Sequence, residues 1–323
     1  MTRALEAAGT VEVARIERSG MIESRHLGAA AVVDGAGTVI HAVGDIGALV
    51  YPRSTLKPIQ AVAMLRAGAP LAGPALVLAT ASHAGSPEHI AVVKSMLASS
   101  GLTADALQCP VDWPLGREYA NQLIRDSAQP TRLHMNCSGK HAGFLAACVS
   151  RSWSTADYLD PAHPLQEAVR DTVVEFTGEP VEHSGTDGCG APVHAVTLAG
   201  LARAIGRIAG STEGEPAVLA SAIREHPWAI DGRGRANTIV VEQLGLIAKL
   251  GAEGVMVMGA RTGHAVAVKI LDGSLRAATL VALELLVESG VVTRDAVAPV
   301  LEATTERVLG GGVPVGRLLV TIR

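Results

Sequence analysis

The sequence predicts an α+β protein in which both ends of the chain contribute strands to one antiparallel sheet and a mostly helical part is inserted between them. Strand patterns occur near the N-terminus and return beyond about residue 253, while apolar residues at helical spacing dominate the middle. The strands do not alternate regularly with helices, which argues against a Rossmann fold or a barrel. We expect one region over residues 1–323, with a sheet part at 1–70 and 253–323 and a helical part at 71–252.

The first sheet part is predicted to contain a strand, a hairpin and a helix. Residues 11–17 alternate between apolar and polar side chains, as a half-buried strand does. Residues 29–34 and 38–44 flank a Gly-Ala-Gly segment, which is typical of a hairpin with a three-residue turn. Residues 58–68 are rich in Ala, Leu and Met and end in glycine, which predicts a helix.

The middle of the chain is predicted to be helical. Ser86 is a typical helix cap, and Pro87 and Glu88 after it are residue types that favour the first helical turn. A helix should therefore begin here and run to about residue 99. The apolar run at 74–78 is expected to be a strand leading into the loop before this helix. Further helices are predicted at 139–149, 164–177, 192–208 and 216–225.

The second sheet part is predicted from the return of apolar β-like segments. Residues 255–258 and 264–271 are expected to be strands, and an Asp-Gly turn follows the second of them. A helix is expected at 275–289 and a last strand at 318–322.

Composition excludes several classes of protein. Hydrophobic residues make up 48% of the 323 residues and charged residues 18%, as in a well-buried globular protein. The net charge is −4 and the basic residues are scattered, which argues against nucleic acid or a membrane surface as a partner. No apolar run approaches the roughly 18–20 residues of a membrane helix. Four widely spaced cysteines and no signal-peptide pattern predict a reducing, cytoplasmic location.

Ser54 and Lys57 form the first candidate for chemistry. Three residues apart at a helix start, they can share one helix face, so a neutral lysine could take the serine proton. The alternative is an N-cap serine beside a solvated lysine. Because Ser-x-x-Lys also occurs by chance in many proteins, the motif alone leaves both interpretations open.

Three other segments are unusually dense in small, polar and ionisable residues. They are Ser-His-Ala-Gly-Ser at 82–86, Asn-Cys-Ser-Gly-Lys-His at 136–141 and Thr-Asp-Gly-Cys-Gly at 186–190. Cys137 and Cys189 could share a metal, but their separation lacks zinc-finger spacing, so buried structural thiols are the expectation from spacing alone. Lys269 lies in an apolar strand, where it is either functional or an edge lysine facing water.

Together these segments resemble the bacterial L-asparaginase II family of the Rhizobium type, over nearly the whole chain. Five pieces carry the resemblance in order: Pro-Arg-Ser-x-x-Lys-Pro at 52–58, Ser-His-x-Gly at 82–85, Cys-Ser-Gly-Lys-His at 137–141, Asp-Gly-Cys at 187–189 and Gly-Ala-Glu-Gly at 251–254. The resemblance implies a fold similar to the serine β-lactamases and penicillin-binding proteins. Those enzymes also place a Ser-x-x-Lys nucleophile at a helix start and a second lysine on a strand.

The resemblance also implies roles for individual residues. Two Ser–Lys pairs carry over as Ser54 with Lys57, Ser54 being the nucleophile, and Ser82 with Lys269. A zinc ion would be held by two cysteines and a lysine, which match Cys137, Lys140 and Cys189. Positions near the substrate match Arg53, for an α-carboxylate, and Asp187, for an α-ammonium, with His141 as a further polar contact. The family further implies a homodimer.

The implied reaction is hydrolysis of L-asparagine to L-aspartate and ammonia. Two alternatives stay open: the same chemistry on glutamine, a β-lactam or another small amide, and a non-catalytic asparagine-binding protein of the same fold. Which serine attacks, and whether zinc takes part, is left open by the sequence.

Overall fold

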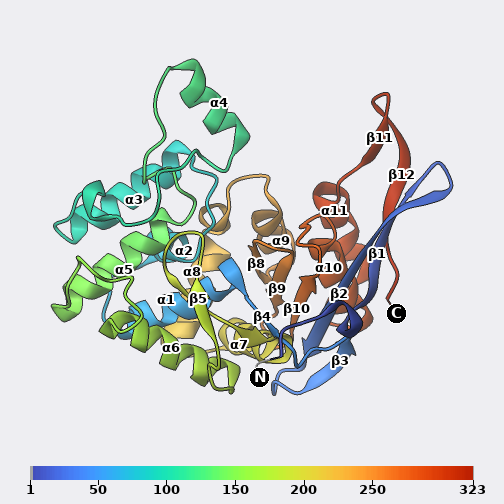
Figure 1. Ribbon diagram of the computed structural model, residues 1–323, viewed down its shortest axis with the longest axis horizontal. Helices are drawn as coiled ribbons and strands as arrows, with labels where there is room; N and C mark the ends of the chain where they lie inside the picture. Colours follow the sequence, from blue (N-terminus) through green and yellow to red (C-terminus); the bar gives the residue numbers. More distant parts are fainter. Residues whose placement is uncertain (1–2, 323) are drawn as a thin grey trace.

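The computed structural model describes residues 3–322 and contains a curved antiparallel sheet on one side and a group of helices on the other (Figure 1). The strands of the large sheet run in the order β11-β12-β1-β2-β10-β9-β8, and β3 pairs with β2 off this path. They are β1 (Val11–Arg18), β2 (Met21–Val33), β3 (Val39–Val43), β8 (Ile247–Gly251), β9 (Val255–Gly259), β10 (Ala265–Ile270), β11 (Val308–Gly310) and β12 (Val313–Val320).

Both ends of the chain meet in this sheet, as the sequence predicts. β1 pairs antiparallel with β12, with Ala14 opposite Val320 and Ile16 opposite Leu318. The next strand, β2, pairs with β10, so strands far apart in sequence alternate across the sheet. The predicted antiparallel sheet of both chain ends is confirmed.

Most helices form the other part of the molecule. They are α1 (Lys57–Arg66), α2 (Gly73–Ala79), α3 (Pro87–Ser99), α4 (Arg117–Arg125), α5 (Ser138–Arg151), α6 (Pro164–Thr177) and α8 (Gly214–Glu225), while α9 (Ala236–Leu244) packs on strand β8 and on α11 (Arg294–Thr304). α4 stands away from the rest at the top of Figure 1, and none of its residues is buried. Two small sheets pair β4 (Leu49–Val50) with β7 (Val196–Thr197) and β5 (Ser184–Thr186) with β6 (Pro192–His194).

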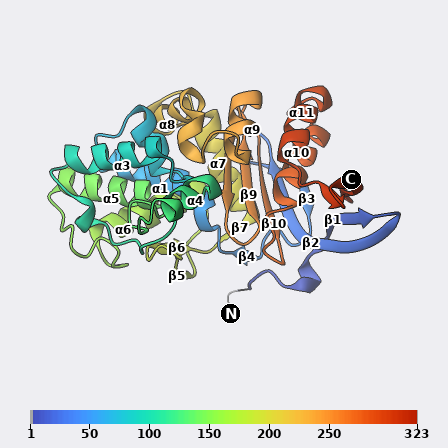
Figure 2. The same cartoon turned by 90° about the horizontal axis from the view of Figure 1, so that it is seen from above.

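Helices cover the central strands of the large sheet on both faces. α7 (Leu198–Gly210) packs on β9 and β10 from the side of the helical part, and α10 (Ala278–Glu288) packs on the same strands from the other side, with α11 beyond it (Figure 2). Every residue of β9 is consequently buried. A strand covered on both faces reads as a continuous apolar run, which is why β9 has no polar alternation.

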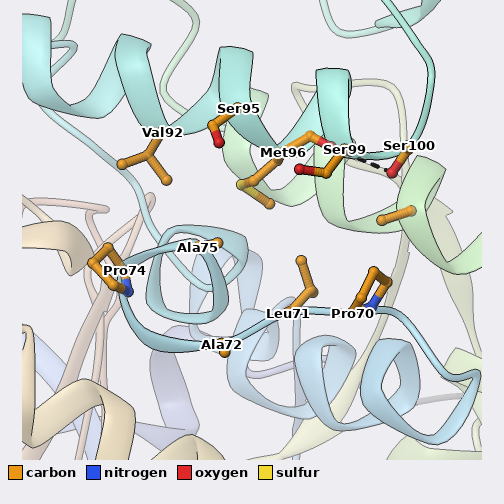
Figure 3. Close-up of a pocket in the computed structure, with 11 residues that line it drawn as sticks. Pro70, Leu71, Ala72, Pro74, Ala75, Val92, Ser95, Met96, Ser99 and Ser100 are labelled. Carbon is orange, nitrogen blue, oxygen red and sulfur yellow. Dashed lines mark hydrogen bonds between the residues drawn. The ribbon is translucent and has the colours of Figure 1, made fainter.

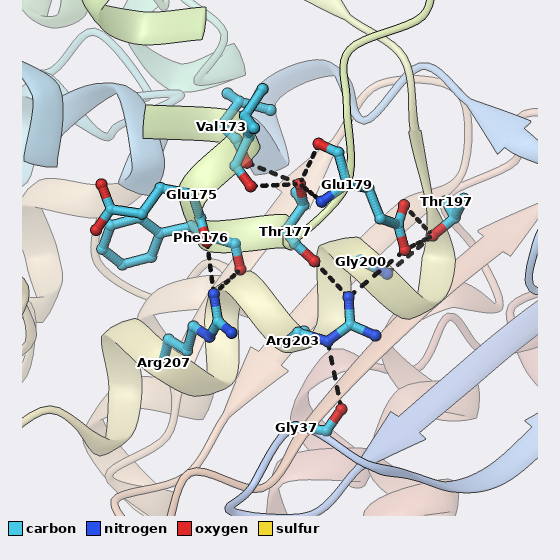
Figure 4. A network of polar contacts seen from close by, with 11 residues as sticks. Gly37, Val173, Glu175, Phe176, Thr177, Glu179, Thr197, Gly200, Arg203 and Arg207 are labelled. Atoms are coloured by element: carbon cyan, nitrogen blue, oxygen red, sulfur yellow. Dashed lines mark hydrogen bonds and ion pairs between the residues drawn. The ribbon is translucent and has the colours of Figure 1, made fainter. Parts of the chain in front are cut away.

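A polar network fastens the helical part to the sheet (Figure 4). Arg203 of α7 donates to the carbonyl of Gly37, in the turn between β2 and β3, and to the carbonyl of Thr177 at the end of α6. Glu179 accepts a hydrogen bond from Thr197, the residue that caps α7. One arginine therefore joins the hairpin turn, α6 and α7.

Two predicted elements are wrong. The apolar run at 74–78 belongs to helix α2, where Pro74 occupies the first turn. The helix predicted at 192–208 begins only at Leu198, because the β-branched segment before it forms β6 and β7. The hydroxyl of Thr197 then accepts a hydrogen bond from the Gly200 amide and starts the helix. Apolar runs of this length fit either a buried strand or a buried helix.

The core is one continuous cluster of mostly aliphatic side chains, joined by a few aromatic ones such as Phe144 and Tyr158, consistent with an aromatic content of only 2%. Among residues 3–322, no helix is both long enough and apolar enough to span a membrane.

Candidate active site

Ser54 lies in a strained turn that leads into α1. The turn is the 3-10 helix Arg53–Leu56, and Arg53 has a φ of 51°, a left-handed conformation that residues other than glycine rarely adopt. Glu253, whose φ is 61°, faces it, with 3.8 Å between the Arg53 guanidinium and the Glu253 carboxylate. Strained backbone of this kind persists where the surrounding structure holds it, and it gathers at functional sites.

The end of β8 lies directly against this turn. A Cβ on Gly251 would stand 2.8 Å from the carbonyl oxygen of Pro52 and 3.3 Å from the amide nitrogen of Ser54. Only glycine permits this approach, so Gly251 fixes the distance between the sheet and the Ser54 backbone.

Lys57 is buried, and its ammonium makes three contacts. It donates to the carbonyl of Ala81, to the hydroxyl of Ser82 at 3.1 Å and to the sulfur of Cys137 at 3.2 Å. Within the described part of the chain it makes no hydrogen bond to Ser54, the partner expected from sequence. Lys57 therefore joins the Ser54 turn to the two loops that carry Ser82 and Cys137.

The lysine that contacts Ser82 from the sheet is Lys249, not Lys269. Lys249 lies in β8, is fully buried, and donates to the Ser82 hydroxyl at 2.9 Å and to the Leu250 carbonyl at 2.5 Å. Lys269, in β10, donates instead to the carbonyls of Glu253 and Ile270. The predicted pairing of Ser82 with Lys269 is wrong because the side chain of Lys269 turns to backbone carbonyls at the end of its own hairpin.

Ser82 consequently lies between two buried lysines. Burial, followed by the nearby positive charge of Lys57, lowers the pKa of Lys249 from 10.5 to about 7. A lysine with such a pKa is partly neutral near pH 7 and can accept a proton from a hydroxyl. Sequence reasoning missed Lys249, although Lys249-Leu250-Gly251 has the Lys-x-Gly pattern that follows the serine motifs of the penicillin-binding enzymes.

Cys137, Lys140 and Cys189 gather in one buried cluster beside Lys57. Cys137 and Lys140 lie at the start of α5, and Cys189 lies in the loop between β5 and β6. The Lys140 ammonium donates to the Cys189 sulfur at 2.9 Å. The three residues that the resemblance proposes as zinc ligands are therefore brought together, although two of them are 52 positions apart in sequence.

The neighbouring groups in this cluster shift the pKa values of both cysteines and of Lys140. A hydrogen bond from Cys137, together with the charge of Lys140, lowers the pKa of the Cys189 thiol against the opposing effect of burial. The same hydrogen bond, together with burial, raises the pKa of the Cys137 thiol. Burial works against the Lys140 ammonium, but the facing sulfur of Cys189 raises its pKa overall. The directions of these pKa shifts favour negative charge on Cys189 over Cys137 and positive charge on Lys140.

His141 lies against the same cluster. Its Nδ1 makes a 2.8 Å hydrogen bond with the Tyr158 hydroxyl, while its buried Nε2 has no hydrogen-bond partner in the part of the chain that the structure describes. Burial lowers the pKa of His141 to about 4, so the ring is neutral at pH 7. Among residues 3–322, no three His, Cys, Asp or Glu side chains are placed to share a metal ion. The donors gathered here are two sulfurs, the Lys140 nitrogen and the His141 imidazole.

Arg53 and Asp187, predicted to bind substrate, bind each other. The Arg53 Nε donates to a carboxylate oxygen of Asp187 at 2.7 Å, and Asp187 is mostly buried. The pair holds the Cys189 loop against the Ser54 turn. Neither residue lines the cavity at the serines.

A cavity of about 190 Å³ opens at the two serines. It is lined by Ser54, Ser82, Leu115, Asn136, Asp231, Arg235, Asn237, Lys249, Leu250, Gly251, Ala252 and Leu275. Two hydroxyls and a lysine of lowered pKa in the lining of one small cavity can carry out acyl transfer from a small amide.

A second cavity, of about 250 Å³, lies between the segment around Pro74 and helix α3 (Figure 3). Its lining contains only Pro, Leu, Ala, Val, Ser and Met side chains. Because none of these titrates, this cavity offers neither a general acid nor a general base.

A comparison with known proteins identifies a family whose model covers nearly the whole chain. The family model described as L-asparaginase II matches residues 14–320. This match contains every serine, lysine and cysteine discussed above. No curated protein matches the chain.

Several solved structures are similar to this chain at low identity. A beta-lactamase from Mycobacterium bovis is 16% identical, with a TM-score of 0.43 over 81% of this chain and 94% of that one. A Bacillus glutaminase is 13% identical, with a TM-score of 0.34 over 81% of this chain and 90% of that one. The protein Mglu in its native form is 15% identical, with a TM-score of 0.39 over 82% and 65% of the two chains.

Proposed function

Because the chain belongs to the L-asparaginase II family and is therefore an amide hydrolase, we propose that it converts L-asparagine to L-aspartate and ammonia through a serine nucleophile activated by lysine. The observation that carries this mechanism is the contact of the Ser82 hydroxyl with both Lys57 and Lys249, beside Ser54 in one small cavity. Two buried lysines on one hydroxyl serve proton transfer better than they serve stability, because burying an ammonium is costly.

Ser54 is the proposed nucleophile. Its hydroxyl attacks the side-chain amide carbon and loses its proton to the chain of Lys57, Ser82 and Lys249, which returns a proton to the leaving ammonia. Water then hydrolyses the aspartyl ester by the same path, giving aspartate and the free serine. Each proton that leaves a nucleophile is thus returned to a leaving group.

The oxyanion is proposed to lie between the amides of Ser54 and Ala252. The Gly251 contact brings the end of β8 within reach of the Ser54 amide, and Ala252, the next residue, lines the cavity. Two preorganised backbone donors would stabilise the tetrahedral oxygen.

Replacing Ser54 tests the assignment of the nucleophile. We expect Ser54→Ala to lower kcat for ammonia release from asparagine by about 10³-fold or more, because no covalent ester can form. Ser82→Ala is expected to lower it by about 10²–10⁴-fold through loss of proton transfer. Mass spectrometry of acid-quenched Ser82→Ala should still find an acyl group on Ser54. An acyl group on Ser82 in Ser54→Ala would reverse the two roles.

Ammonia release across a panel of amides tests the substrate. Asparagine is expected to have the highest kcat/KM among asparagine, glutamine and β-lactams. A higher value for glutamine or a β-lactam would replace the proposed substrate and keep the chemistry.

We also propose that Cys137, Lys140 and Cys189 hold a zinc ion. Their sulfur and nitrogen donors are of the kinds zinc prefers, and the His141 ring lies against Cys189. Binding would require Lys140 to lose its proton to the metal's charge. Zinc, held there, would supply Lewis-acid chemistry, and the site is linked to Ser82 through Lys57, which contacts both Cys137 and Ser82.

Metal analysis of matched cysteine variants tests this site. Wild-type protein grown with zinc is expected to carry about one zinc per chain, and Cys189→Ser is expected to lose it. Cys148→Ser is the control, since Cys148 is equally buried but lies in α5 without a metal-binding neighbour in the cluster. Wild-type protein without zinc, or equal loss in both variants, would contradict the proposal.

The family resemblance further leads us to propose a cytoplasmic homodimer. The four cysteines are unpaired and buried, as thiols in a reducing compartment are. Light scattering should give twice the mass of one chain, and cell fractionation should recover the protein with cytoplasmic markers.

A further inference from the structure

The candidate cavity contains an arginine that no sequence motif singled out. Its ionisable lining residues are Asp231, Arg235 and Lys249. Lys249 is committed to Ser82 at 2.9 Å, which leaves Arg235 as the cation with donors toward the cavity. Arg235 is 36% exposed at its side chain, so its guanidinium meets both the protein and the open space.

Asp231 holds Arg235 in place from behind. One carboxylate oxygen of Asp231 accepts a hydrogen bond from Arg235 Nε at 2.5 Å. The other accepts one from the backbone amide of Asn237 at 3.3 Å. The Asp231 side chain is only 5% exposed, so it is fixed by burial as well. A guanidinium has five N–H donors, and Asp231 takes the one on Nε. The terminal nitrogens make no hydrogen bond within the described part of the chain.

Two neighbouring features favour an anion at these nitrogens. Arg235 is the residue that precedes α9, and the start of a helix stabilises negative charge. Asn237 also lines the cavity, and its side-chain oxygen is occupied by the Leu250 amide at 2.9 Å, which leaves its NH₂ group as a donor. A guanidinium fork with an amide donor beside it matches the geometry of a carboxylate.

Arg53, expected from sequence to bind the carboxylate, is placed differently. Its guanidinium lies 2.7 Å from Asp187 and 3.8 Å from Glu253. Two carboxylates already neutralise its charge, and it does not line the cavity. Arg235 has one carboxylate partner and an open side.

We infer that Arg235, positioned by Asp231, binds the carboxylate of the substrate and makes the cavity selective for amides that carry one. This inference rests on the proposed amide hydrolysis and names its substrate class: small amides with an anionic carboxylate two or three carbons from the reacting carbonyl.

The test compares asparagine with 3-aminopropanamide, which is asparagine without its carboxylate. Wild-type protein is expected to prefer asparagine in kcat/KM by roughly 100-fold or more, because a site built for a charged group rejects the analogue that lacks it. In Arg235→Met, kcat/KM for asparagine should fall by roughly 100-fold, mainly through a higher KM. The kcat/KM for 3-aminopropanamide should fall by less than about 3-fold. The preference should therefore nearly vanish.

Arg233→Met is the matched control. Arg233 lies two residues away, is 67% exposed at its side chain and pairs with Glu88 outside the cavity. Its replacement should leave kcat/KM unchanged for both asparagine and 3-aminopropanamide. If Arg235→Met proves unfolded by circular dichroism, Arg235→Lys, which keeps a cation without the fork, should still lower the preference for asparagine.

Three outcomes overturn the inference: an equal loss on both substrates, an unchanged preference in Arg235→Met, or loss of the preference in Arg53→Met instead. Wild-type protein that hydrolyses neither amide would instead refute the proposed function. In that case the carboxylate site can still be tested by binding. The Kd values of aspartate and of β-alanine, which lacks one carboxylate, are measured for wild type and for Arg235→Met, and only wild type should prefer aspartate.

Discussion

Lys249 connects the sheet to the chemistry at the level of a single residue. It is buried in β8, and Asp231 and Arg235 act on it with opposite charges from the cavity wall. Its burial means that the protonated form is disfavoured in the folded protein, while the unfolded chain keeps an ordinary lysine. Both activity and stability should therefore respond to pH around this group.

The pH dependence of activity is the first prediction. Lys249 must be neutral to accept a proton, so kcat/KM for asparagine should rise as the pH passes about 7, the pKa of Lys249. Initial rates between pH 5.5 and 9 measure this limb. A profile that is flat across pH 6–8 would show that Lys249 does not need to lose its proton.

Stability should change in the same direction, by linkage. Below pH 7 both the folded and the unfolded states hold the proton on Lys249, and between about 7 and 10.5 only the unfolded state does. Because the unfolded state binds more protons in that window, the contribution of Lys249 to the free energy of unfolding rises with pH there. Urea unfolding of wild type and Lys249→Met at pH 6.5 and 9 measures this contribution, as the difference between the two proteins in how the free energy of unfolding changes with pH. An equal change between the two pH values in both proteins would contradict this account.

Two strand lysines provide a direct test of which one serves Ser82. Lys249→Met should lower kcat by about 10²–10⁴-fold, since the contact with the Ser82 hydroxyl is lost. Lys269→Met removes a lysine whose contacts are the carbonyls of Glu253 and Ile270, and kcat should stay within a few-fold. The reverse order would restore the pairing predicted from sequence.

The residue scale also shows what sequence reasoning can and cannot find. Ser54, Ser82 and the two cysteines lie in loops with conspicuous local motifs, and the structure gathers them. Lys249 has only a short Lys-x-Gly pattern and Arg235 has no motif, so it is the fold of distant strands and helices that brings both to the cavity. Which of two strand lysines reaches Ser82 depends on strand order, and sequence spacing does not encode strand order.

At the scale of elements, the contact between β8 and the Ser54 turn determines the geometry of the site. Gly251→Ala would place a methyl group 2.8 Å from the Pro52 carbonyl oxygen and push the strand away from the turn. We expect a loss of about 1–3 kcal/mol in the free energy of unfolding and a lower kcat, because the oxyanion donors separate. Urea denaturation and initial rates measure the two effects.

Gly47→Ala is the matched control for that change. Its added Cβ would meet only a carboxylate oxygen of Asp45, at an ordinary 3.7 Å. Activity and stability should both stay close to wild type. Equal effects in the two variants would show that the close approach at Gly251 is not what matters.

Element boundaries were predictable where a local signal fixed them. Ser86 caps α3 as expected, since its hydroxyl accepts from the His89 amide at 3.2 Å, and α6 begins and ends where its proline and glycine predict. The segment 192–208 was misassigned because its apolar residues satisfy two periodicities, and only pairing with β4 and β5 decides for strands. Long-range pairing of this kind leaves no local trace.

At the scale of the whole molecule, the two chain ends close the sheet. Ile16 of β1 and Leu318 of β12 lie opposite each other and are buried, with 1% and 8% exposure. The general arrangement was predictable, because β-like patterns stood at both ends. Strand order and register were not, since they depend on partners as far apart in sequence as Ile16 and Leu318.

A double-mutant cycle measures this closure. Ile16→Ala should cost about 2–4 kcal/mol in the free energy of unfolding, and the cycle with Leu318→Ala should show a coupling of about 0.5–1 kcal/mol. Val313 lies in the same strand as Leu318 but is 59% exposed. In a cycle of Ile16→Ala with Val313→Ala, the two changes in the free energy of unfolding should therefore add. Additivity in both cycles would mean that the two ends do not support each other.

The pairing of β1 with β12 also affects how the protein is made. β1 leaves the ribosome about 300 residues before β12, and at roughly 5–20 residues per second this takes on the order of 15–60 s. During translation one edge of β1 has no partner strand, and an unpaired edge is a template for aggregation. Chaperones that shield nascent chains should therefore matter more for the yield of this protein than for one whose first strands pair with their immediate neighbours.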